Sequence, residues 1–328
     1  MESIVVKDNR ELQLHVYVLG YYPEGECILI VLWDNSTKQP LKSILTDCYE
    51  QNGVNKIHDK LNHYGFKTKK LDYVIWTHPD KDHSVGFSTI VKDYSTRETL
   101  FLIPDGWFAF RNFLDKEKRK SWMFLVKQRM ANNRTIETIN VSNRRKHPLE
   151  YANLYCDGYN DDFEFGLEIL TPFADQVSRH VFINKTREEN DISISFIVKF
   201  GKVGFYFGGD SENEAIKRII EDKFKNVIFV KIPHHGSDSS DILPGILERI
   251  HKDDMEQIIS VSTGFHIGNN SLPLVEVLDY YKKISSEVLV TEDTIHTNRY
   301  GLWCCKFNRK SNTPIELIAD GDAIKYQV

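Results

Sequence analysis

Three apolar segments of this chain each run directly into a loop rich in histidine and aspartate, and this pattern constrains the fold most. The segment "LDYVIWT" precedes "HPDKDH", "VGFYF" precedes "GGD", and "VIFVKIP" precedes "HHG". Each segment has the length and the β-branched or aromatic content of a buried strand. Functional side chains of α/β proteins gather where strands end, so we expect the three loops to meet at one edge of the structure.

The rest of the chain alternates strand-like and helix-like segments in two similar runs. "LQLHVYVLG", "CILIVLW" and "KSILTDC" read as strands, and a helix at about 54–64 follows them. In the second run, the strands "FGLEILTP" and "ISISFIVKFG" are followed by a predicted helix, "SENEAIKRIIEDKF". We therefore predict an α/β (α+β) fold of two half-sheets packed face to face with helices outside, a four-layer αβ/βα sandwich.

We expect one domain over residues 1–328, with an insertion at about 105–160. The apolar runs are shorter than the roughly 20 residues that cross a bilayer, and the N-terminus lacks the pattern of a signal peptide. Five scattered cysteines form no CxxC pair, which favours reduced thiols. We expect a cytoplasmic protein without a membrane partner. A net charge of −5 gives no general affinity for nucleic acid.

The three loops contain residue types that bind divalent metals. Imidazole nitrogen and carboxylate oxygen together suit Zn, Mn or Fe, and two close metals need about this many side chains with one carboxylate shared. Each loop alone is weak evidence, because an isolated histidine is more often structural. Their joint occurrence after apolar strands predicts metal binding. The candidate ligands are His78, Asp80, Asp82, His83, Asp210, His234 and His235.

These motifs resemble those of the metallo-β-lactamase superfamily. "THPDKDHSVG" resembles its HxHxDH signature, with Asp80 at the position of the second histidine, and "FYFGGDSE" resembles its later "GD" motif. "VKIPHHGSDSS" is similar to the "PHHGS" segment of the soluble hydrolase domain of the ComEC competence family. "GECILIVL" and "ILTDCYEQNG" resemble the first strand and turn of that branch. The resemblance runs from about Leu14 to Leu302 and is broken at about 105–160.

The resemblance implies a site for two divalent metal ions, Zn or Mn. All the candidates above would lie in the ligand set, and Asp210 would bridge the two ions. One of His234 and His235 would complete the second metal, and the sequence leaves open which. Asp82 would also position or deprotonate the attacking water, so it is the predicted catalytic base.

Residues around the ligand candidates also have expected roles. By the resemblance, Asp47 would orient the first loop, and Asn190 or Asp191 stands where related branches carry a further histidine ligand. Ser237 would bind a substrate oxygen or, alternatively, cap the next turn. The family's "GHP" motif is missing here, so His266 is the candidate to hold the substrate in its place, with a structural role as the alternative.

The predicted function is a metal-dependent hydrolase, a phosphodiesterase or nuclease that acts on nucleic acid or nucleotides together with protein partners. The carboxylate at Asp80 makes the ligand set oxygen-rich, which suits harder metals and phosphate chemistry. Basic segments at Lys116–Lys120 and Arg144–His147 would follow a nucleic-acid backbone or, alternatively, form solvated surface. The other two hypotheses are a carboxylic ester, lactone or thioester hydrolase on the same fold, and a catalytically weak binding or sensor module.

Overall fold

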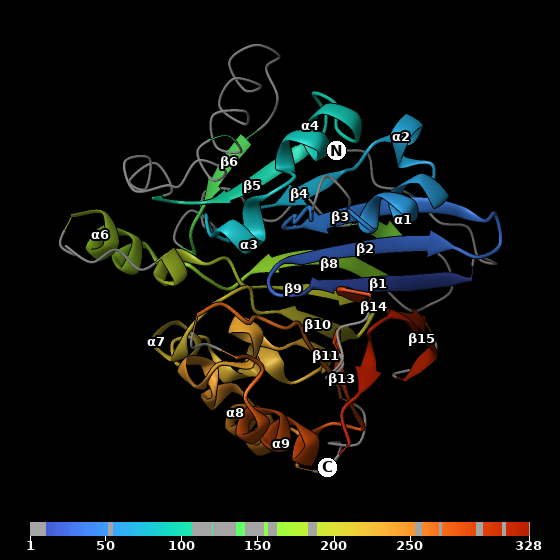
Figure 1. Cartoon of the computed structure of the whole chain (residues 1–328). Coiled ribbons are helices and arrows are strands. Elements are labelled where there is room, and N and C mark those ends of the chain that lie inside the picture. The colour runs from blue at the N-terminus through green and yellow to red at the C-terminus, as the bar shows by residue number, and fades with distance from the viewer. Residues whose placement is uncertain are drawn as a thin grey trace.

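The computed structural model places two β-sheets face to face, with helices on the outer side of each (Figure 1). The described residues are 11–51, 55–106, 120, 136–141, 154–156, 163–182, 189–252, 258–268, 271–292, 298–309 and 313–327. The predicted α/β class and four-layer αβ/βα arrangement are confirmed, and the architecture is consistent with the metallo-β-lactamase type.

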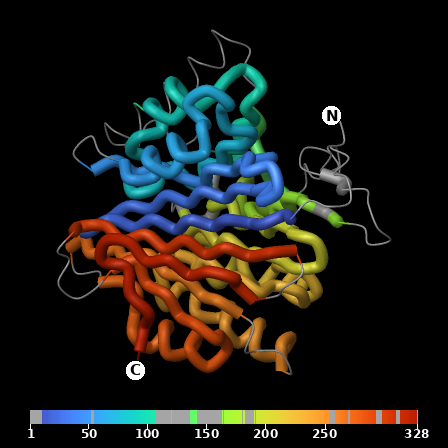
Figure 2. The backbone as a smooth tube through the Cα atoms, turned by 90° about the vertical axis from the view of Figure 1, so that its right-hand side faces the viewer, coloured from blue at the N-terminus to red at the C-terminus, as the bar shows by residue number. Residues whose placement is uncertain are grey.

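The first sheet has the strand order β15-β14-β1-β2-β3-β4-β5-β6. Its inner strands are buried on both faces, which explains the nearly continuous apolar run "ILIVLW". Figure 2 shows the C-terminal strands in red beside the blue N-terminal ones, so both ends of the chain build this sheet. The strands are β1 (Leu12–Tyr21), β2 (Glu26–Asp34), β3 (Gln39–Thr46), β4 (Tyr73–Ile75), β5 (Leu100–Pro104), β6 (Ile136–Ile139), β14 (Tyr300–Asn308) and β15 (Pro314–Gly321).

The second sheet has the order β16-β13-β12-β11-β10-β9-β8-β7. Strands β10 to β13 run parallel to one another, so their carboxyl ends lie at a common edge. This is the edge at which two of the three polar loops begin. The strands are β7 (Leu154–Cys156), β8 (Phe163–Ile169), β9 (Phe196–Phe200), β10 (Val203–Phe207), β11 (Val227–Lys231), β12 (Ile259–Ser262), β13 (Glu287–Val290) and β16 (Ile324–Lys325).

Helices cover the outer face of each sheet and bury a second apolar layer there (Figure 1). The first sheet is covered by α1 (Ile57–His63), α2 (Phe66–Lys69) and α4 (Phe87–Asp93), and the second by α7 (Asn213–Ile216), α8 (Ile242–Ile250) and α9 (Val275–Ile284). Shorter or peripheral helices are α3 (Lys81–Ser84), α6 (Ala174–Phe182), η3 (Glu189–Ile192), η4 (Glu221–Phe224), η5 (Pro233–Gly236) and η6 (Asp238–Ser240). None of the helices within the described ranges has the length and apolar character that spanning a membrane requires.

The structure differs from the sequence-based prediction in one helix. The predicted helix at 211–224 is wrong as a continuous element, because α7 ends at Ile216 and Ile220 is extended before η4 begins. This break leaves the Ile220 side chain 68% exposed while Phe224 is fully buried. Most of the predicted insertion at about 105–160 lies outside the described residues; its described parts include the edge strands β6 and β7. The prediction of a single domain stays a prediction.

The core between the sheets contains aromatic rings from both of them. Phe205 on β10 is fully buried and meets Phe307 on β14 edge to face, with ring centroids 4.7 Å apart and an interplanar angle of 83°. Such pairs contribute beyond the area that they bury. The rings therefore hold the two sheets at a fixed separation, on which the meeting of the loops depends.

We expect Phe205→Ala to lower the free energy of unfolding by about 3 to 5 kcal/mol, because it removes this contact and leaves a cavity between the sheets. Urea denaturation followed by circular dichroism measures the change. The control is Ile220→Ala at an exposed site, which should stay within about 0.5 kcal/mol of the parent chain. Equal effects of the two substitutions would contradict the inferred packing.

Candidate metal centre

The first polar loop begins where β4 ends, and its shape is fixed by hydrogen bonds. Trp76 Nε1 donates to Ser84 Oγ at 3.0 Å, and the Ser84 hydroxyl donates to the Asp80 carbonyl at 2.5 Å. The Thr77 carbonyl accepts from the Ile194 N–H at 2.9 Å, which ties the loop to the second sheet. The residues after Thr77 are thus presented to the edge where β10 and β11 end.

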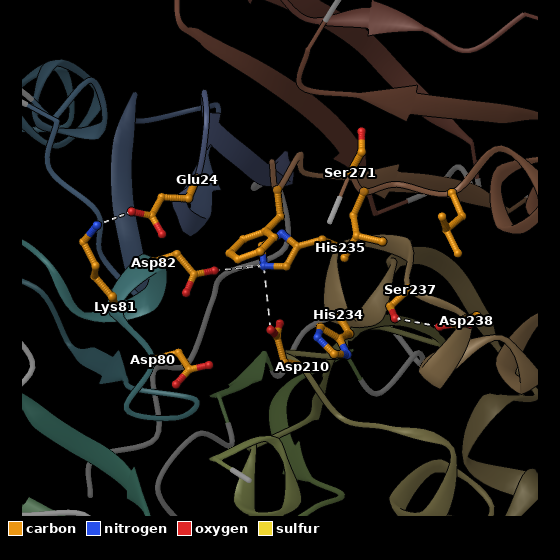
Figure 3. A pocket seen from close by; sticks show the side chains of 13 residues that line it. Glu24, Asp80, Lys81, Asp82, Asp210, His234, His235, Ser237, Asp238 and Ser271 are labelled. Atoms are coloured by element: carbon orange, nitrogen blue, oxygen red, sulfur yellow. Dashed lines mark hydrogen bonds and ion pairs between the residues drawn. The ribbon is translucent and has the colours of Figure 1, made fainter. Parts of the chain in front are cut away.

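Four buried side chains from both sheets converge at this edge: Asp82, His83, Asp210 and His235, with one ligand atom each within 4.8 Å of the others. His235 Nε2 lies 3.1 Å from Asp82 Oδ2 and 3.7 Å from Asp210 Oδ2, the two dashed contacts at the centre of Figure 3. His83 Nε2 lies 3.3 Å from Asp82 Oδ2 and 3.4 Å from Asp210 Oδ1. The three loops therefore meet, as their positions after strands predicted.

A further imidazole, next to that of His83 with ring centroids 4.2 Å apart, also approaches Asp210. His78 is fully buried, and its Nε2 lies 3.6 Å from Asp210 Oδ2 and 3.7 Å from Asp80 Oδ2. Within the described part of the chain this nitrogen makes no hydrogen bond. Asp210 thus lies within 3.7 Å of three imidazole nitrogens, those of His83, His235 and His78.

Asp47 fixes two of these imidazoles from behind. Its Oδ2 accepts from His83 Nδ1 at 2.8 Å and from the Thr77 hydroxyl at 2.6 Å, and its Oδ1 accepts from the Thr77 N–H at 2.7 Å. Because the Thr77 hydroxyl donates to Asp47, it accepts from His78 Nδ1 at 3.0 Å. Asp47 adopts a positive φ of 56°, which aspartate tolerates better than most residues.

Glu26 serves the third imidazole in the same way, and the sequence analysis did not identify it. The Thr263 hydroxyl donates to Glu26 Oε2 at 2.6 Å and accepts from His235 Nδ1 at 2.9 Å. The fully buried Lys231 ammonium forms an ion pair with the same oxygen at 2.7 Å. A signal was present: "GECILIVL" and "VIFVK" each place a charge in an apolar strand, and buried charges are normally paired.

When these rings are neutral, the donor order places the proton of His78, His83 and His235 on Nδ1. Each Nε2 can then bind an ion at the centre, where His83 Nε2 and His235 Nε2 lie 3.3 Å apart among carboxylate oxygens. Metal-binding histidines usually have the opposite ring nitrogen bonded to a carboxylate or hydroxyl in this way. The residues present therefore fit a metal ion.

Two adjacent groups of buried side chains have the composition to hold metal ions. One is the four-residue group described above, and the other consists of Glu26, Asp47 and His83. In the second group Asp47 and Glu26 Oε2 accept from Thr77, Thr263, Lys231 and an imidazole, whereas Glu26 Oε1 makes no hydrogen bond in the described part of the chain. These contacts support the rings of the first group.

The "HHG" loop sends its two histidines in different directions. His234 and His235 both have positive φ, 45° and 52°, so consecutive side chains separate sharply. His235 enters the buried group, whereas His234 Nδ1 lies 2.8 Å from Ser239 Oγ and its Nε2 accepts from Asn190 Nδ2 at 3.3 Å. Asn190 thus contacts His234 rather than the four-residue group. The side chain of Asp191 lies outside the described residues.

The carboxyl and imidazole groups of the site stabilise one another in their ionised forms. Burial raises the pKa of Asp82 and of Asp210, but the neighbouring imidazoles outweigh burial and hold both pKa values well below their usual range. Burial lowers the pKa of His83, but Asp210, Asp82 and Asp47 together raise it well above its usual value. A proton on His83 thus partly balances the carboxylates when no metal is bound.

The remaining predicted residues lie around this centre. Ser237 lines the pocket above it and accepts from the Ser239 N–H at 3.3 Å. His266 bonds to Glu292 Oε1 at 2.7 Å and contacts Ser271 Oγ at 3.0 Å, and Ser271 itself lines the pocket. The substrate-binding roles of Ser237 and His266 and the ligand roles of the residues above stay predictions. Apart from Lys120, the two basic segments lie outside the described residues.

A comparison of the chain with models of known protein families gives no match, and a comparison with curated proteins gives no significant match.

We expect Glu26→Gln to lower the affinity for a divalent metal about 10- to 100-fold, because His235 loses the carboxylate that fixes its tautomer through Thr263. It should also destabilise the fold, since the Lys231 ammonium is left buried without a counter-charge. Titration of the metal-free chain with Zn²⁺ in calorimetry measures the affinity.

Two variants distinguish the effect of Glu26 on the orientation of His235 from its effect on the stability of the fold. Glu26→Gln combined with Lys231→Met should recover stability but not metal affinity, because the unpaired charge is removed while Thr263 still faces an amide oxygen instead of a carboxylate. Glu168→Gln is the matched control: this buried carboxylate pairs with Lys223 at 2.6 Å, away from the metal centre, so its loss should leave metal affinity unchanged. Recovery of affinity in the double variant would contradict the orienting role of Glu26.

We also expect metal binding to release protons at about pH 7, because the raised pKa of His83 keeps it protonated there before the ion enters. Metal affinity should therefore rise with pH until that pKa is passed. Calorimetry in buffers of different ionisation enthalpy counts the protons. Binding without proton release would show that His83 does not give up a proton to the ion.

Proposed function

We propose that this protein is a metal-dependent hydrolase of the metallo-β-lactamase type, whose dinuclear site cleaves phosphodiesters of nucleotides or nucleic acid. The observation that carries the proposal is the buried convergence of Asp82, His83, Asp210 and His235 at the floor of an open pocket. Buried carboxylates and imidazoles in such numbers are costly unless they coordinate a metal, and a pocket above them gives a substrate access.

The donors divide into two ion positions in this proposal. Asp82, His83 and His235 would hold the first ion, His78 and Asp80 would hold the second, and Asp210 would be shared. Asp210 is the shared residue in this division, since its carboxylate lies 3.4 Å from His83 Nε2, 3.7 Å from His235 Nε2 and 3.6 Å from His78 Nε2. When bound, two divalent ions supply Lewis-acid stabilisation and lower the pKa of water.

Asp82 is the proposed base. It lines the pocket, so it is accessible to a water molecule there, although it is only 5% exposed. The imidazoles of His83 and His235 outweigh the effect of burial on its pKa and keep it ionised, hence able to accept a proton. Its contacts with both rings fix the direction in which that proton is taken.

A phosphodiester suits this donor set better than a carboxylic ester does. Asp80 supplies an oxygen where the superfamily's signature has an imidazole, which shifts preference toward harder ions such as Mn²⁺ and toward phosphate oxygens. The resemblance of "VKIPHHGSDSS" to the hydrolase domain of the ComEC family supports the same substrate class. Zn²⁺ and Mn²⁺ are the proposed ions.

We expect the metal-loaded protein to hydrolyse bis(p-nitrophenyl) phosphate, and Asp82→Asn to lower kcat about 10²- to 10⁴-fold, because the variant lacks the group that accepts the proton. Release of p-nitrophenol measures the rate, and the metal content of each preparation is measured alongside. Asp222→Asn, at a 71% exposed carboxylate on η4, is the control and should keep the parent rate.

The same assay with p-nitrophenyl acetate separates the alternatives. Faster turnover of the acetate, with no phosphodiester cleavage in either Zn²⁺ or Mn²⁺, would contradict the phosphodiesterase proposal and favour a carboxylic ester hydrolase. Failure to bind either ion, with an intact fold, would instead favour a binding or sensor module.

A further inference from the structure

A pocket of about 500 Å³ opens above the metal centre. This volume lies within the range of small-molecule sites, about 300 to 1,000 Å³. Its floor is formed by Asp80, Asp82, Asp210 and His235. Figure 3 shows Lys81 and Glu24 on one side of His235 and Ser271 on the other.

One side of the pocket carries an ammonium group at a fixed position. Lys81 Nζ is ion-paired with Glu24 Oε1, and the same oxygen accepts from the Tyr49 hydroxyl at 3.4 Å. Glu24 is buried, whereas the Lys81 side chain is 47% exposed. Because Glu24 anchors it to the wall, the ammonium does not fold over Asp80 and Asp82 and stays available to a ligand.

The charge of the pocket becomes favourable for an anion only with metals bound. Five carboxylates line it, and Lys81 is the one lysine or arginine among the described lining residues. Two divalent ions would offset the four negative charges that remain. A phosphate could then approach the ions and reach Lys81 without net repulsion.

Another part of the pocket lining is apolar. Phe265, Leu272 and Leu274 line it, and all three are only half-buried. The backbones of Phe265 and Leu272 are paired by hydrogen bonds of 3.0 Å and 2.8 Å, and the Phe265 ring lies 5.5 Å from the His235 ring. This wall is therefore fixed relative to the metal centre, and its exposed surface suits a weakly polar ring.

We infer that the pocket binds a single nucleotide-like unit, with its phosphate between the metal centre and Lys81 and its base against Phe265, Leu272 and Leu274. The inference rests on the proposed function, which it narrows to substrates that place one phosphate and one ring in the pocket. One ammonium and one apolar wall match one such unit, since bases stack on aromatic side chains irrespective of sequence.

Binding of product-like probes to the metal-loaded full chain tests the inference. Calorimetry compares adenosine 5′-monophosphate, inorganic phosphate and adenosine. We expect the monophosphate to bind tighter than either part alone. Lys81→Met should weaken the monophosphate and phosphate about tenfold, the loss expected for a hydrogen bond to a charged group, and leave adenosine unchanged. Phe265→Ala should weaken the monophosphate and adenosine about fivefold or more and leave phosphate unchanged.

A matched control is available for each variant. Lys325 pairs with Glu287 at 2.7 Å and is 44% exposed, so Lys325→Met removes a comparable ammonium far from the pocket and should change nothing. Phe265→Leu keeps an apolar side chain without the aromatic ring and replaces Phe265→Ala if that variant melts at a lower temperature. Metal content is measured for every variant.

Three results would overturn the inference: a monophosphate that binds no tighter than phosphate, Lys81→Met without effect on phosphate, or Phe265 variants that weaken phosphate as much as adenosine. Hydrolysis of bis(p-nitrophenyl) phosphate is measured separately. If that reaction proceeds and the binding pattern fails, the pocket assignment is wrong while the proposed function stands. If no phosphodiester is hydrolysed, the proposed function fails and the binding pattern still decides what the pocket holds.

Discussion

The structure depends on the burial of carboxylates and imidazoles from both sheets at one edge. Asp82 and His83 come from the first sheet, and Asp210 and His235 from the second, yet their ligand atoms lie within 4.8 Å of one another. Such a group is costly to bury without a cation, because its charges lose their hydration. Two further carboxylates fix the rings from behind. The sheets must therefore stay in register for the site to exist.

Much of the fold could be predicted from the sequence. The sequence contains two similar runs of apolar strands that end in polar loops. This pattern is sufficient to predict two sheets with helices outside and the meeting of the loops at one edge. The local sequence pattern gave a wrong secondary structure where tertiary packing determines the backbone conformation. The segment at 211–224 has a helical pattern, but it breaks at Ile220 so that Phe224 can reach the core of the second sheet. No local signal in the chain encodes that break.

The site was predictable in its residue types and less so in its geometry. The sequence could not separate His234 from His235, because two successive positive φ angles set by the surrounding loop decide which ring turns inward. Glu26 and Lys231 were missed, although opposite charges inside two apolar strands are a signal that such a pair forms. Glu26 orients His235 through Thr263. This contact joins distant segments of the chain, so the hydrophobic periodicity of each segment does not reveal it.

The most direct test of the central claim is the anomalous diffraction of crystals grown with Zn²⁺ or Mn²⁺. We expect two peaks about 3.5 to 4 Å apart. One should be bound by Asp82, His83 and His235, the other by His78 and Asp80, with Asp210 between them. A single ion elsewhere, or an edge without any ion at saturating metal, would contradict it.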